Sequence, residues 1–403
     1  MKKIGRSKIK PQKLSKEETK KKIVSSIKKE QEKIKLLGLK DEIEFKYETN
    51  KWNVISLFSG CGGMDLGLLL GGLDVFNENE NLSSTNVKDS VFNIMYVVDN
   101  FKEAIETHKR NLIDNGTYYD TRDIRKIPKF PKCDLVIGGF PCPGFSLGGP
   151  RLIDDERNFL YIHFIRALKD SKPNIFVAEN VKGLLTLGKG AAFDQIKKDF
   201  EEAGYTVFSK LLNSEEYGVP QKRERVFIVG IKKESDYSYN FPSATHGGLL
   251  KKTVTLKDSI FDLKDSPGPL HVGDYSSIYM SRNRKKKWND TSFTIQASGR
   301  QTPLHPSGPT MKYISKDKWI FTGGPSETRR LSVKETARIQ TFPDWFKFYD
   351  EKNNISNQQI EKIYKQIGNA VPVQLARSVF LPIAEYAFGE LKKRNKKRKR
   401  NKI

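Results

Sequence analysis

Short apolar segments alternate with amphipathic ones across residues 52–231, and this alternation limits the fold more than any other feature of the sequence. The apolar segments have the length of buried strands and cover residues 54–58, 95–98, 134–137, 174–178, 206–212 and 225–231. Segments with helical spacing lie between them, at residues 64–70, 102–110, 158–169 and 193–203. Because strands that alternate with helices form parallel sheets covered on both faces, we predict an α/β fold with a doubly wound, mostly parallel sheet over residues 51–231.

The pattern changes outside this main domain. Residues 71–93 are polar and predict a loop insertion. Residues 232–325 are rich in Ser, Thr, Gly and Pro without a helical period, which predicts a smaller second lobe of short strands and loops. Residues 331–342 and 371–388 regain apolar, helical spacing, and we expect residues 326–390 to rejoin the first lobe.

Most of the positive charge lies at the two ends of the chain. Lys+Arg 72 minus Asp+Glu 48 gives a net charge of +24, and residues 1–50 and 391–403 hold most of this excess. We expect a basic N-terminal extension, helical or disordered, and a disordered basic tail. Blocks of like charge often bind polyanions, so nucleic acid is the first partner to consider, although a lysine-rich surface also serves solubility.

Several classes of protein are excluded by the composition. No apolar run approaches the ~20 residues that a membrane span needs, and the charged N-terminus does not read as a secretory signal. The three cysteines, Cys61, Cys133 and Cys142, include no Cys-x-x-Cys pair, which excludes a disulfide scaffold and a structural zinc site. We therefore predict no metal and a reducing, cytoplasmic setting.

A glycine-rich turn follows the first predicted strand, with the sequence FSGCGG at residues 58–63. Such a turn lets the backbone approach a nucleotide-like ligand, but Asp65 stands where a dinucleotide fingerprint has its third glycine. Asp99 ends the second strand, where an acid binds ribose hydroxyls, and Asp123 with Ile124 could hold an adenine edge. Each residue alone could be a cap or turn residue, but their order favours a nucleoside cofactor without pyrophosphate, such as S-adenosyl-L-methionine.

The sequence GGFPCPGFS at residues 138–146 places Cys142 on a loop directly after a strand, where α/β sheets hold active sites. A buried structural cysteine is the usual alternative, but the flanking prolines and glycines suit exposure better. Glu179 ends the next strand and should emerge at the same edge. A thiolate that adds to carbon 6 of cytosine, with an acid at ring nitrogen 3, makes carbon 5 able to accept a methyl group.

Residues 221–225, with the sequence QKRER, precede the last strand of the main domain. The simplest interpretation is a charged turn. The functional one places Gln221, Arg223 and Arg225 on one face, toward the same pocket as Glu179.

Together these segments resemble the DNA (cytosine-5)-methyltransferase family of the bacterial restriction-modification type. The resemblance covers residues 52–385 and follows the family's motif order, at residues 58–63, 138–146, 179–181, 221–225, 330–343 and 364–372. Many relatives have Pro-Pro-Cys-Gln where this chain has FPCP at residues 140–143, but the Pro-Cys pair is kept. The resemblance implies the fold of methyltransferases that use S-adenosyl-L-methionine, with a target-recognition lobe at residues 232–325.

The resemblance also implies roles for single residues. Cys142 would be the nucleophile, Glu179 would contact the base at ring nitrogen 3 and the exocyclic amine, and Arg223 and Arg225 would lie near the flipped base. The positions that match cofactor contacts are Phe58, Gly60, Gly62, Asp99, Asp123, Ile124, Pro141, Leu160, Asn369 and Val371. The product would be S-adenosyl-L-homocysteine.

The implied substrate is double-stranded DNA, from which the target cytosine must be flipped because the pocket cannot reach a stacked base. Our candidates for DNA contact, by phosphate binding or base reading, are Gln221, Arg282, Arg284, Lys285, Lys286, Arg300 and Gln301. We expect a monomeric, bacterial, DNA-associated protein without membrane contact. A cognate restriction endonuclease would act on the same site without forming a stable complex.

Other interpretations remain open at this level. A transfer-RNA cytosine methyltransferase on the same scaffold usually carries a Cys-Phe-Thr segment, which is absent, and its second lobe should be smaller. A non-catalytic DNA-binding protein would have lost chemical residues that this chain retains. An amino-methyltransferase needs an Asp/Asn-Pro-Pro-Tyr-type segment, which is also absent, and a nicotinamide oxidoreductase needs the missing third glycine.

Overall fold

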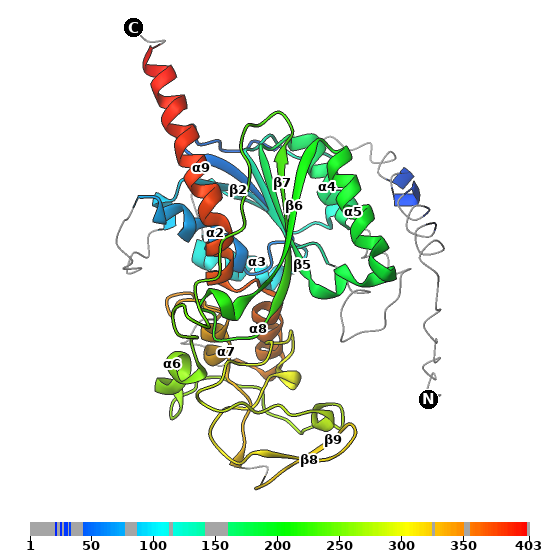
Figure 1. The fold of residues 1–403 in the computed structure, drawn as a ribbon, viewed down its shortest axis with the longest axis vertical. Helices are drawn as coiled ribbons and strands as arrows, with labels where there is room; N and C mark the ends of the chain where they lie inside the picture. Colours follow the sequence, from blue (N-terminus) through cyan, green and yellow to red (C-terminus); the bar gives the residue numbers. More distant parts are fainter. Residues whose placement is uncertain are drawn as a thin grey trace.

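A computed structural model describes residues 43–76, 87–112, 116–141, 160–324, 327–349 and 355–400, with a few positions between 21 and 33. Within these residues the first lobe is a seven-stranded sheet in the order β3-β2-β1-β4-β5-β7-β6 (Figure 1). The strands are β1 (Trp52–Leu57), β2 (Phe92–Val98), β3 (Tyr118–Asp120), β4 (Leu135–Gly138), β5 (Ile175–Val181), β6 (Tyr205–Asn213) and β7 (Glu224–Lys232). Strands β1 to β5 pair in parallel and β7 is antiparallel to both neighbours, which confirms a mostly parallel sheet.

Helices cover both faces of the sheet. One face carries α4 (Tyr161–Ser171) and α5 (Ala191–Glu202), and the other carries α2 (Gly63–Asp74), α3 (Lys102–Leu112) and α9 (Val373–Arg400) (Figure 1). Successive side chains of a strand point to opposite faces, so Val54 belongs to the hydrophobic core of the α2–α9 side and Ile55 to that of the α4–α5 side. Burial on both faces explains why these strands read as continuous apolar runs.

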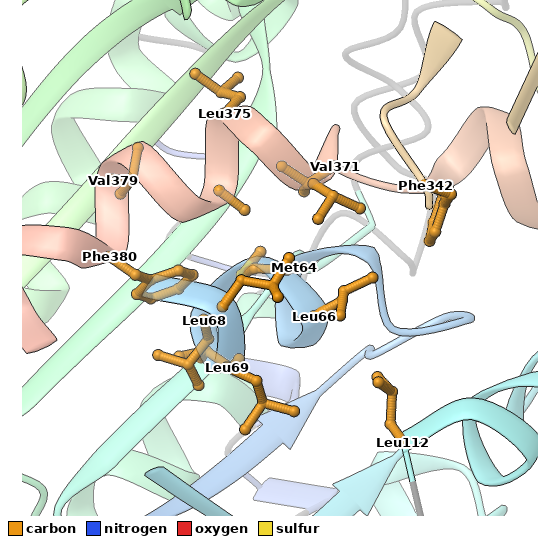
Figure 2. Close-up of a cluster of buried hydrophobic side chains, with 14 of the residues drawn as sticks. Met64, Leu66, Leu68, Leu69, Leu112, Phe342, Val371, Leu375, Val379 and Phe380 are labelled. Atoms are coloured by element: carbon orange, nitrogen blue, oxygen red, sulfur yellow. The ribbon is translucent and has the colours of Figure 1, made fainter. Parts of the chain in front are cut away.

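Helices α2 and α9 pack with their backbones in close contact. A Cβ atom on Gly67 would lie 2.4 Å from Ala376 Cβ and 2.7 Å from the Val373 carbonyl oxygen, so no larger residue fits there. Figure 2 shows Phe380 of α9 reaching α2 next to Met64 and Leu68, while Leu69 lies on the side of α2 away from α9. All of these side chains are buried, so a helix from the end of the chain completes the core beside the first strand.

Two expected irregular segments contain regular structure. Part of the predicted loop at residues 71–93 belongs to α2, which ends at Asp74, and to β2, which begins at Phe92. The predicted disorder of the basic tail is wrong as far as Arg400, because α9 continues to that residue. Lys and Arg are good helix formers, and here they only extend a helix that the core has already nucleated. In addition, cations are favoured near the C-terminus of a helix.

The second lobe lies beyond one end of the sheet (Figure 1). It contains a short helix, α6 (Leu256–Ile260), several single 3₁₀ turns and a two-stranded hairpin of β8 (Met311–Ser315) and β9 (Lys318–Phe321). Its small core is built on Tyr279, Leu304 and Met311. The expected lobe of short strands and loops is therefore confirmed, with α6 as an addition that its Thr255–Asp258 capping box could have signalled.

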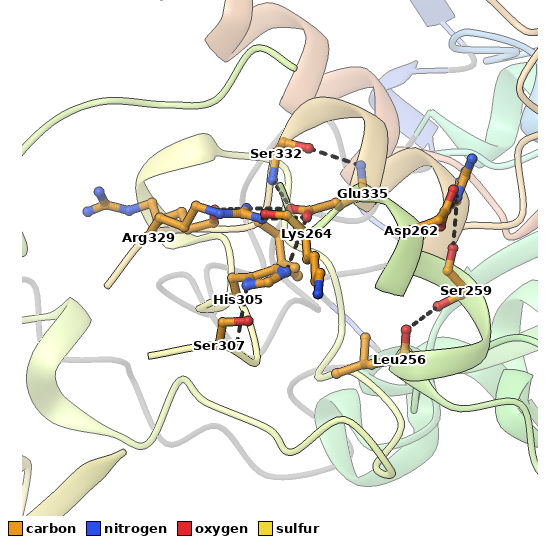
Figure 3. A network of polar contacts seen from close by, with 12 residues as sticks. Leu256, Ser259, Asp262, Lys264, His305, Ser307, Arg329, Ser332 and Glu335 are labelled. Atoms are coloured by element: carbon orange, nitrogen blue, oxygen red, sulfur yellow. Dashed lines mark hydrogen bonds and ion pairs between the residues drawn. The ribbon is translucent and has the colours of Figure 1, made fainter. Parts of the chain in front are cut away.

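Contacts of His305 and Arg329 with Glu335 fix the second lobe to α7 (Val333–Ile339). Both terminal nitrogens of Arg329 donate to Glu335 at 2.7 Å, and the Ser332 N–H donates to the same carboxylate at 2.8 Å (Figure 3). His305 Nε2 lies 3.3 Å from Glu335, and burial lowers the pKa of His305 to about 3, so the ring is neutral at physiological pH. Arg329 therefore supplies the charge that compensates a fully buried carboxylate.

Helix α8 (Asn357–Asn369) joins α7 to α9, and the sequence patterns did not predict it. Its start carries a capping box between Ser356 and Gln359, a local signal that could have located it. In the part of the chain that the structure describes, no helix combines the length and the apolar character that crossing a membrane requires.

Candidate active site

Four residues stand side by side at the carboxyl edge of the sheet. Leu57 of β1 is paired with Val98 of β2 and Gly138 of β4, and Gly138 is paired with Ala178 of β5. The next residues along these strands are Phe58, Asp99, Gly139 and Glu179. Because neighbouring strands lie ~4.8 Å apart, Asp99 and Glu179 are separated by roughly 15 Å along this edge, about the span of a nucleoside and a base. Open α/β sheets bind ligands at this edge.

The glycine-rich turn after β1 is tied to Asp99. The Gly60 N–H donates to Asp99 Oδ2 at 2.9 Å, and the Phe101 N–H donates to Oδ1 at 2.7 Å. Phe58 and Gly60 have positive φ angles of 53° and 55°, which gives the turn its tight left-handed path. Burial raises the pKa of the Asp99 carboxyl, while the two backbone N–H groups counteract this. The carboxylate is thus held in one orientation at the end of β2.

The same turn contacts the junction between α8 and α9. A Cβ atom on Gly63 would lie 2.7 Å from the Val371 carbonyl oxygen, and one on Gly62 would lie 2.8 Å from the His108 ring. Only glycine permits both approaches. Val371 is buried there, and Asn369 is exposed at the end of α8, so both expected cofactor positions lie beside the turn despite their distance in sequence.

Asp123 and Ile124 follow β3 on the far side of Asp99. Asp123 caps a 3₁₀ turn, accepting the Arg125 N–H at 2.9 Å and its guanidinium at 2.6 Å. The guanidinium hydrogen bond lowers the pKa of Asp123. Ile124 is buried, and Phe58 and Leu160 pack against the same hydrophobic cluster. The carboxylate of Asp123 therefore has a structural partner already, whereas the three apolar side chains share one hydrophobic cluster.

Glu179 lies between a cation and the start of the Pro-Cys loop. Its Oε1 accepts from Arg225 Nε at 2.9 Å, because Glu179 pairs with Phe227 across β5 and β7 and Arg225 is the diagonal neighbour on the same face. Its Oε2 is so close to Gly139 that a Cβ atom there would lie 3.1 Å away. Burial raises the pKa of Glu179, while Arg225 and Arg223 oppose that shift.

The Pro-Cys loop begins at a fixed point. Phe140 is buried, with its ring 6.0 Å from that of Phe164, and its carbonyl accepts a hydrogen bond from Asn180 Nδ2 at 3.0 Å. Pro141 follows, half-buried, while Cys142 lies outside the described residues. Asn180 belongs to the motif at residues 179–181, for which we predicted a role of Glu179 alone. Its place directly after the acid at the end of a strand is the sequence signal that could have indicated this anchoring function.

The other two cysteines are poor nucleophiles. Cys61 is buried under the glycine-rich turn, with its Sγ 3.7 Å from the Gln366 carbonyl oxygen, and Cys133 lies just before β4. Burial raises the pKa of both thiols well above the ordinary value, so neither forms a thiolate readily.

Gln221 and Arg223 occupy a different place from the one we expected. Gln221 is fully buried, its Nε2 donates to Gln340 Oε1 at 2.9 Å, and its Oε1 accepts the Ile295 N–H at 2.8 Å. Arg223 is also buried and donates to the carbonyl oxygens of Ile295, Gly368 and Ala370. These two side chains tie the start of β7 to the second lobe and to the α8–α9 junction, and Arg225 alone of the three contacts Glu179.

The second-lobe candidates divide into buried and exposed residues. Arg284 is buried, donating to Gln301 Oε1 at 2.7 Å and to the Tyr279 carbonyl oxygen at 3.1 Å. Lys285 donates to backbone carbonyl oxygens of residues 307 and 308, and burial lowers its pKa to about 8. Arg282 and Arg300 are exposed. Arg284 therefore orients Gln301 and does not itself face solvent.

Comparison with known proteins gives the family. Residues 52–385 match the family model described as C-5 cytosine-specific DNA methylase. The chain belongs to the C-5 cytosine-specific DNA methylase family. It is 54% identical over 378 residues to the Type II methyltransferase M.BsuRI of Bacillus subtilis, covering 90% of this chain and 86% of that protein. It is 52% identical over 406 residues to the Type II methyltransferase M.BspRI of Lysinibacillus sphaericus, covering 96% and 95%.

Solved structures support the same fold at low identity. A DNMT2 variant of Spodoptera frugiperda superposes with a TM-score of 0.58 at 18% identity, over 83% of this chain and 99% of that one. Membership of the methylase family confirms the expected enzyme class, a DNA cytosine-5-methyltransferase, and excludes the nicotinamide oxidoreductase and amino-methyltransferase interpretations. Among the described residues of this methylase, no cluster of His, Cys, Asp and Glu has the arrangement of a metal site.

Proposed function

We propose that this protein transfers the methyl group of S-adenosyl-L-methionine to carbon 5 of a cytosine flipped out of duplex DNA, through a covalent adduct with Cys142. The observation that carries the proposal is the position of the Glu179 carboxyl. It is buried at the sheet edge, paired on one oxygen with Arg225 and close on the other to Gly139, three residues before the cysteine. An acidic side chain therefore lies next to the point where the Pro-Cys loop, which carries Cys142, begins.

The edge from β1 to β2 fits the proposed methyl donor, which supplies an electrophilic methyl group. Asp99 presents acceptor oxygens that two backbone N–H groups hold in place, as recognition of ribose hydroxyls requires. The Gly62–Gly63 turn and Val371 lie against one another, so the backbone can approach the ligand closely. Phe58, Ile124 and Leu160 would supply apolar contacts, and Pro141 and Asn369 would close the site.

The proposed chemistry uses two protein groups. The Cys142 thiolate adds to carbon 6 of the cytosine, and the Glu179 carboxyl donates to ring nitrogen 3, which leaves an electron-rich carbon 5. Carbon 5 would take the methyl group from the sulfonium sulfur of the cofactor, which would leave as S-adenosyl-L-homocysteine. The carbon-5 proton would then pass to water, the bond between carbon 6 and sulfur would break to release the Cys142 thiolate, and ring nitrogen 3 would return its proton to Glu179. Burial favours the protonated form of Glu179, and Arg225 holds the ionised form in place between cycles.

A base in a stacked duplex cannot reach this buried edge, so the target must leave the helix at a cost of a few kcal/mol. We place DNA between the sheet edge and the second lobe at residues 232–325. The exposed Arg282 and Arg300 would contact phosphate or base edges, and Arg284 would orient Gln301. The chain would act as a monomer.

A trapping experiment tests the proposed adduct. Target DNA with 5-fluorocytosine should form a covalent complex with the wild-type protein, because carbon 5 then has no proton to lose. Cys142→Ala should form none and should not methylate, while it still binds the cofactor. Cys133→Ala is the matched control and should form the adduct, because Cys133 lies just before β4, at the opposite edge of the sheet from the site. An adduct with Cys142→Ala, or none with the wild type on DNA that it methylates, would refute the proposal.

The name Type II methyltransferase of the two relatives supports a role as the modification partner of a restriction system. Bisulfite sequencing of DNA from cells that express the protein would identify the modified site. That DNA should then resist an endonuclease of the same specificity. Parallel assays on DNA and transfer RNA should give methylation of DNA alone.

A further inference from the structure

The last nine described residues of α9, 392–400, form a basic segment that we call the α9 end. We propose that the α9 end binds the phosphate backbone of a second duplex DNA segment, separate from the duplex at the catalytic edge. This proposal rests on the proposed function, since it takes DNA as the substrate. It concerns a surface that the catalytic mechanism does not use.

The charge of the α9 end is unusually dense. Every residue from 392 to 400 except Asn395 is Lys or Arg, and no acid interrupts them. Like charges stand at helical i, i+4 spacing in the pairs Lys392–Lys396, Lys393–Lys397, Arg394–Arg398 and Lys396–Arg400. Such pairs destabilise a free helix, so a bound polyanion would relieve a repulsion that the chain itself leaves largely uncompensated. Most of these side chains are exposed and available to a partner.

The α9 end lies far from the catalytic edge. Helix α9 starts beside the cofactor turn, where the Val373 carbonyl oxygen would be 2.7 Å from a Cβ atom on Gly67. It then runs for 28 residues, and at 1.5 Å per residue this is about 40 Å. Leu391 is its last buried apolar residue, after which the helix projects beyond the sheet (Figure 1). The basic residues therefore begin roughly 28 Å from the turn along the helix axis.

Two contacts hold the helix in this direction. Arg394 donates to Asp134 Oδ1 at 2.7 Å, and Asp134 directly precedes β4, so it marks the amino edge of the sheet. Arg398 donates to the Thr49 carbonyl oxygen at 3.4 Å, just before β1. Because these residues flank the beginnings of strands whose other ends form the catalytic edge, the α9 end is fixed on the opposite side of the sheet.

This geometry separates two DNA segments. The second lobe, the sheet and the α9 end follow one another along the longest axis of the molecule (Figure 1). A duplex that passes between the lobes would cross that axis, whereas the α9 end begins roughly 28 Å farther along α9, on the other side of the sheet. The partner is not a membrane surface, because the α9 end has cations on all sides and lacks the apolar face of an interfacial helix.

The test neutralises the α9 end and leaves Arg394 in place. A variant with glutamine at positions 392, 393, 396, 397, 399 and 400, which keeps Arg398 as well, is compared with a control of equal charge change. The control replaces six exposed lysines of the first lobe by glutamine, at positions 129, 132, 169, 189, 198 and 210. Each protein is bound to an immobilised short duplex with one target site, and capture of a second, labelled duplex without a site is measured against salt concentration.

We expect the α9-end variant to capture the second duplex about tenfold less well, with a weaker salt dependence, while kcat/KM on the short duplex stays within about twofold of wild type. The control should keep most of the capture. An equal loss of kcat/KM on the short duplex would overturn the proposal, because the α9 end would then contact the catalytic duplex. Unchanged capture would also overturn it, as would binding of anionic vesicles or RNA in place of duplex DNA. A wild-type protein that fails to methylate the short duplex would instead contradict the proposed function.

Discussion

Two carboxyl groups occupy equivalent positions on one sheet edge, Asp99 after β2 and Glu179 on β5, and they are held in different ways. Burial raises the pKa of both. Asp99 accepts backbone N–H groups on both oxygens, whereas the partner of Glu179 among the described residues is a side chain, the Arg225 guanidinium, on one oxygen. Backbone donors cannot move away, so Asp99 is a fixed acceptor. A side-chain cation can be exchanged for a substrate, so Glu179 can change protonation during a reaction.

Under the proposed function, this difference between a fixed and an adjustable carboxyl would assign the β1–β2 half of the edge to binding and the β4–β5 half to chemistry. The assignment can be tested by separating effects on affinity from effects on rate. A mutation on the binding half should change the cofactor dissociation constant, and one on the chemical half should change kcat.

The largest effect is expected for Glu179→Gln, which removes the transferable proton and keeps the shape. We expect kcat to fall by about 10²–10⁴, the usual contribution of a general acid, with cofactor affinity nearly unchanged. Single-turnover methylation with radiolabelled cofactor measures the first quantity and calorimetry the second. A normal kcat would mean that Glu179 only shapes the pocket.

The next effect is expected for Asp99→Asn, the equivalent change on the binding half. The cofactor Kd should rise by about tenfold to a hundredfold, because hydrogen bonds to charged groups contribute about 1.5–3 kcal/mol. With saturating cofactor, kcat should return to the wild-type level. A lasting loss of kcat at saturation would contradict the division between the two halves.

A smaller effect is expected for Asn180→Ala, which removes the hydrogen bond to the Phe140 carbonyl. Loss of one buried partner costs about 1–3 kcal/mol, so we expect kcat to fall on the order of tenfold as the Pro-Cys loop loses its anchor. Asn111→Ala is the control, since Asn111 also holds a backbone carbonyl, that of Lys347, away from the chemical half. Equal losses of kcat in both variants would indicate a general effect on stability.

The smallest effect is expected for Arg225→Lys, and it concerns pH. The guanidinium opposes the upward shift in the pKa of Glu179, and a lysine would oppose it less well. The proton on Glu179 would then persist to higher pH, so the alkaline limb of the rate profile should move upward, by less than about one pH unit. Arg122→Lys, which changes the pair with Asp120, should leave that limb in place. An acid limb that moves upward while the alkaline limb stays in place would show that the ionised carboxylate is the active form.

The strand ends were predictable because they depend on local pattern. An apolar run that stops at Asp99 or Glu179 places the acid at the carboxyl edge whenever the strands are parallel, and the structure has them there. The directions of Gln221 and Arg223 were not predictable, because they depend on backbone groups of residues 295, 368 and 370 that lie far away in sequence. Gln and Arg suit both DNA contact and internal hydrogen bonding, so the residue type alone does not indicate which of the two applies.

The lengths of helices were also hard to predict. The sequence after Leu70 contains Gly71 and Gly72, which suggest a helix end, yet both glycines are buried in α2, and a Cβ atom on Gly72 would lie 2.1 Å from Ser90 Oγ. Close packing required glycine there, and tertiary contact overrode local propensity. The basic tail was misjudged for the opposite reason, because its charge suggested disorder while its residues favour helix.

The backbone contact between α2 and α9 has a consequence for the synthesis of the protein. The glycine-rich turn at residues 58–63 and helix α2 after it are made early on the ribosome, but their packing partners at residues 370–380 are made among the last. A nascent chain therefore holds the proposed donor site without these partners, however well its sheet has folded. We expect chains that stop before the final helix to lack methyltransferase activity.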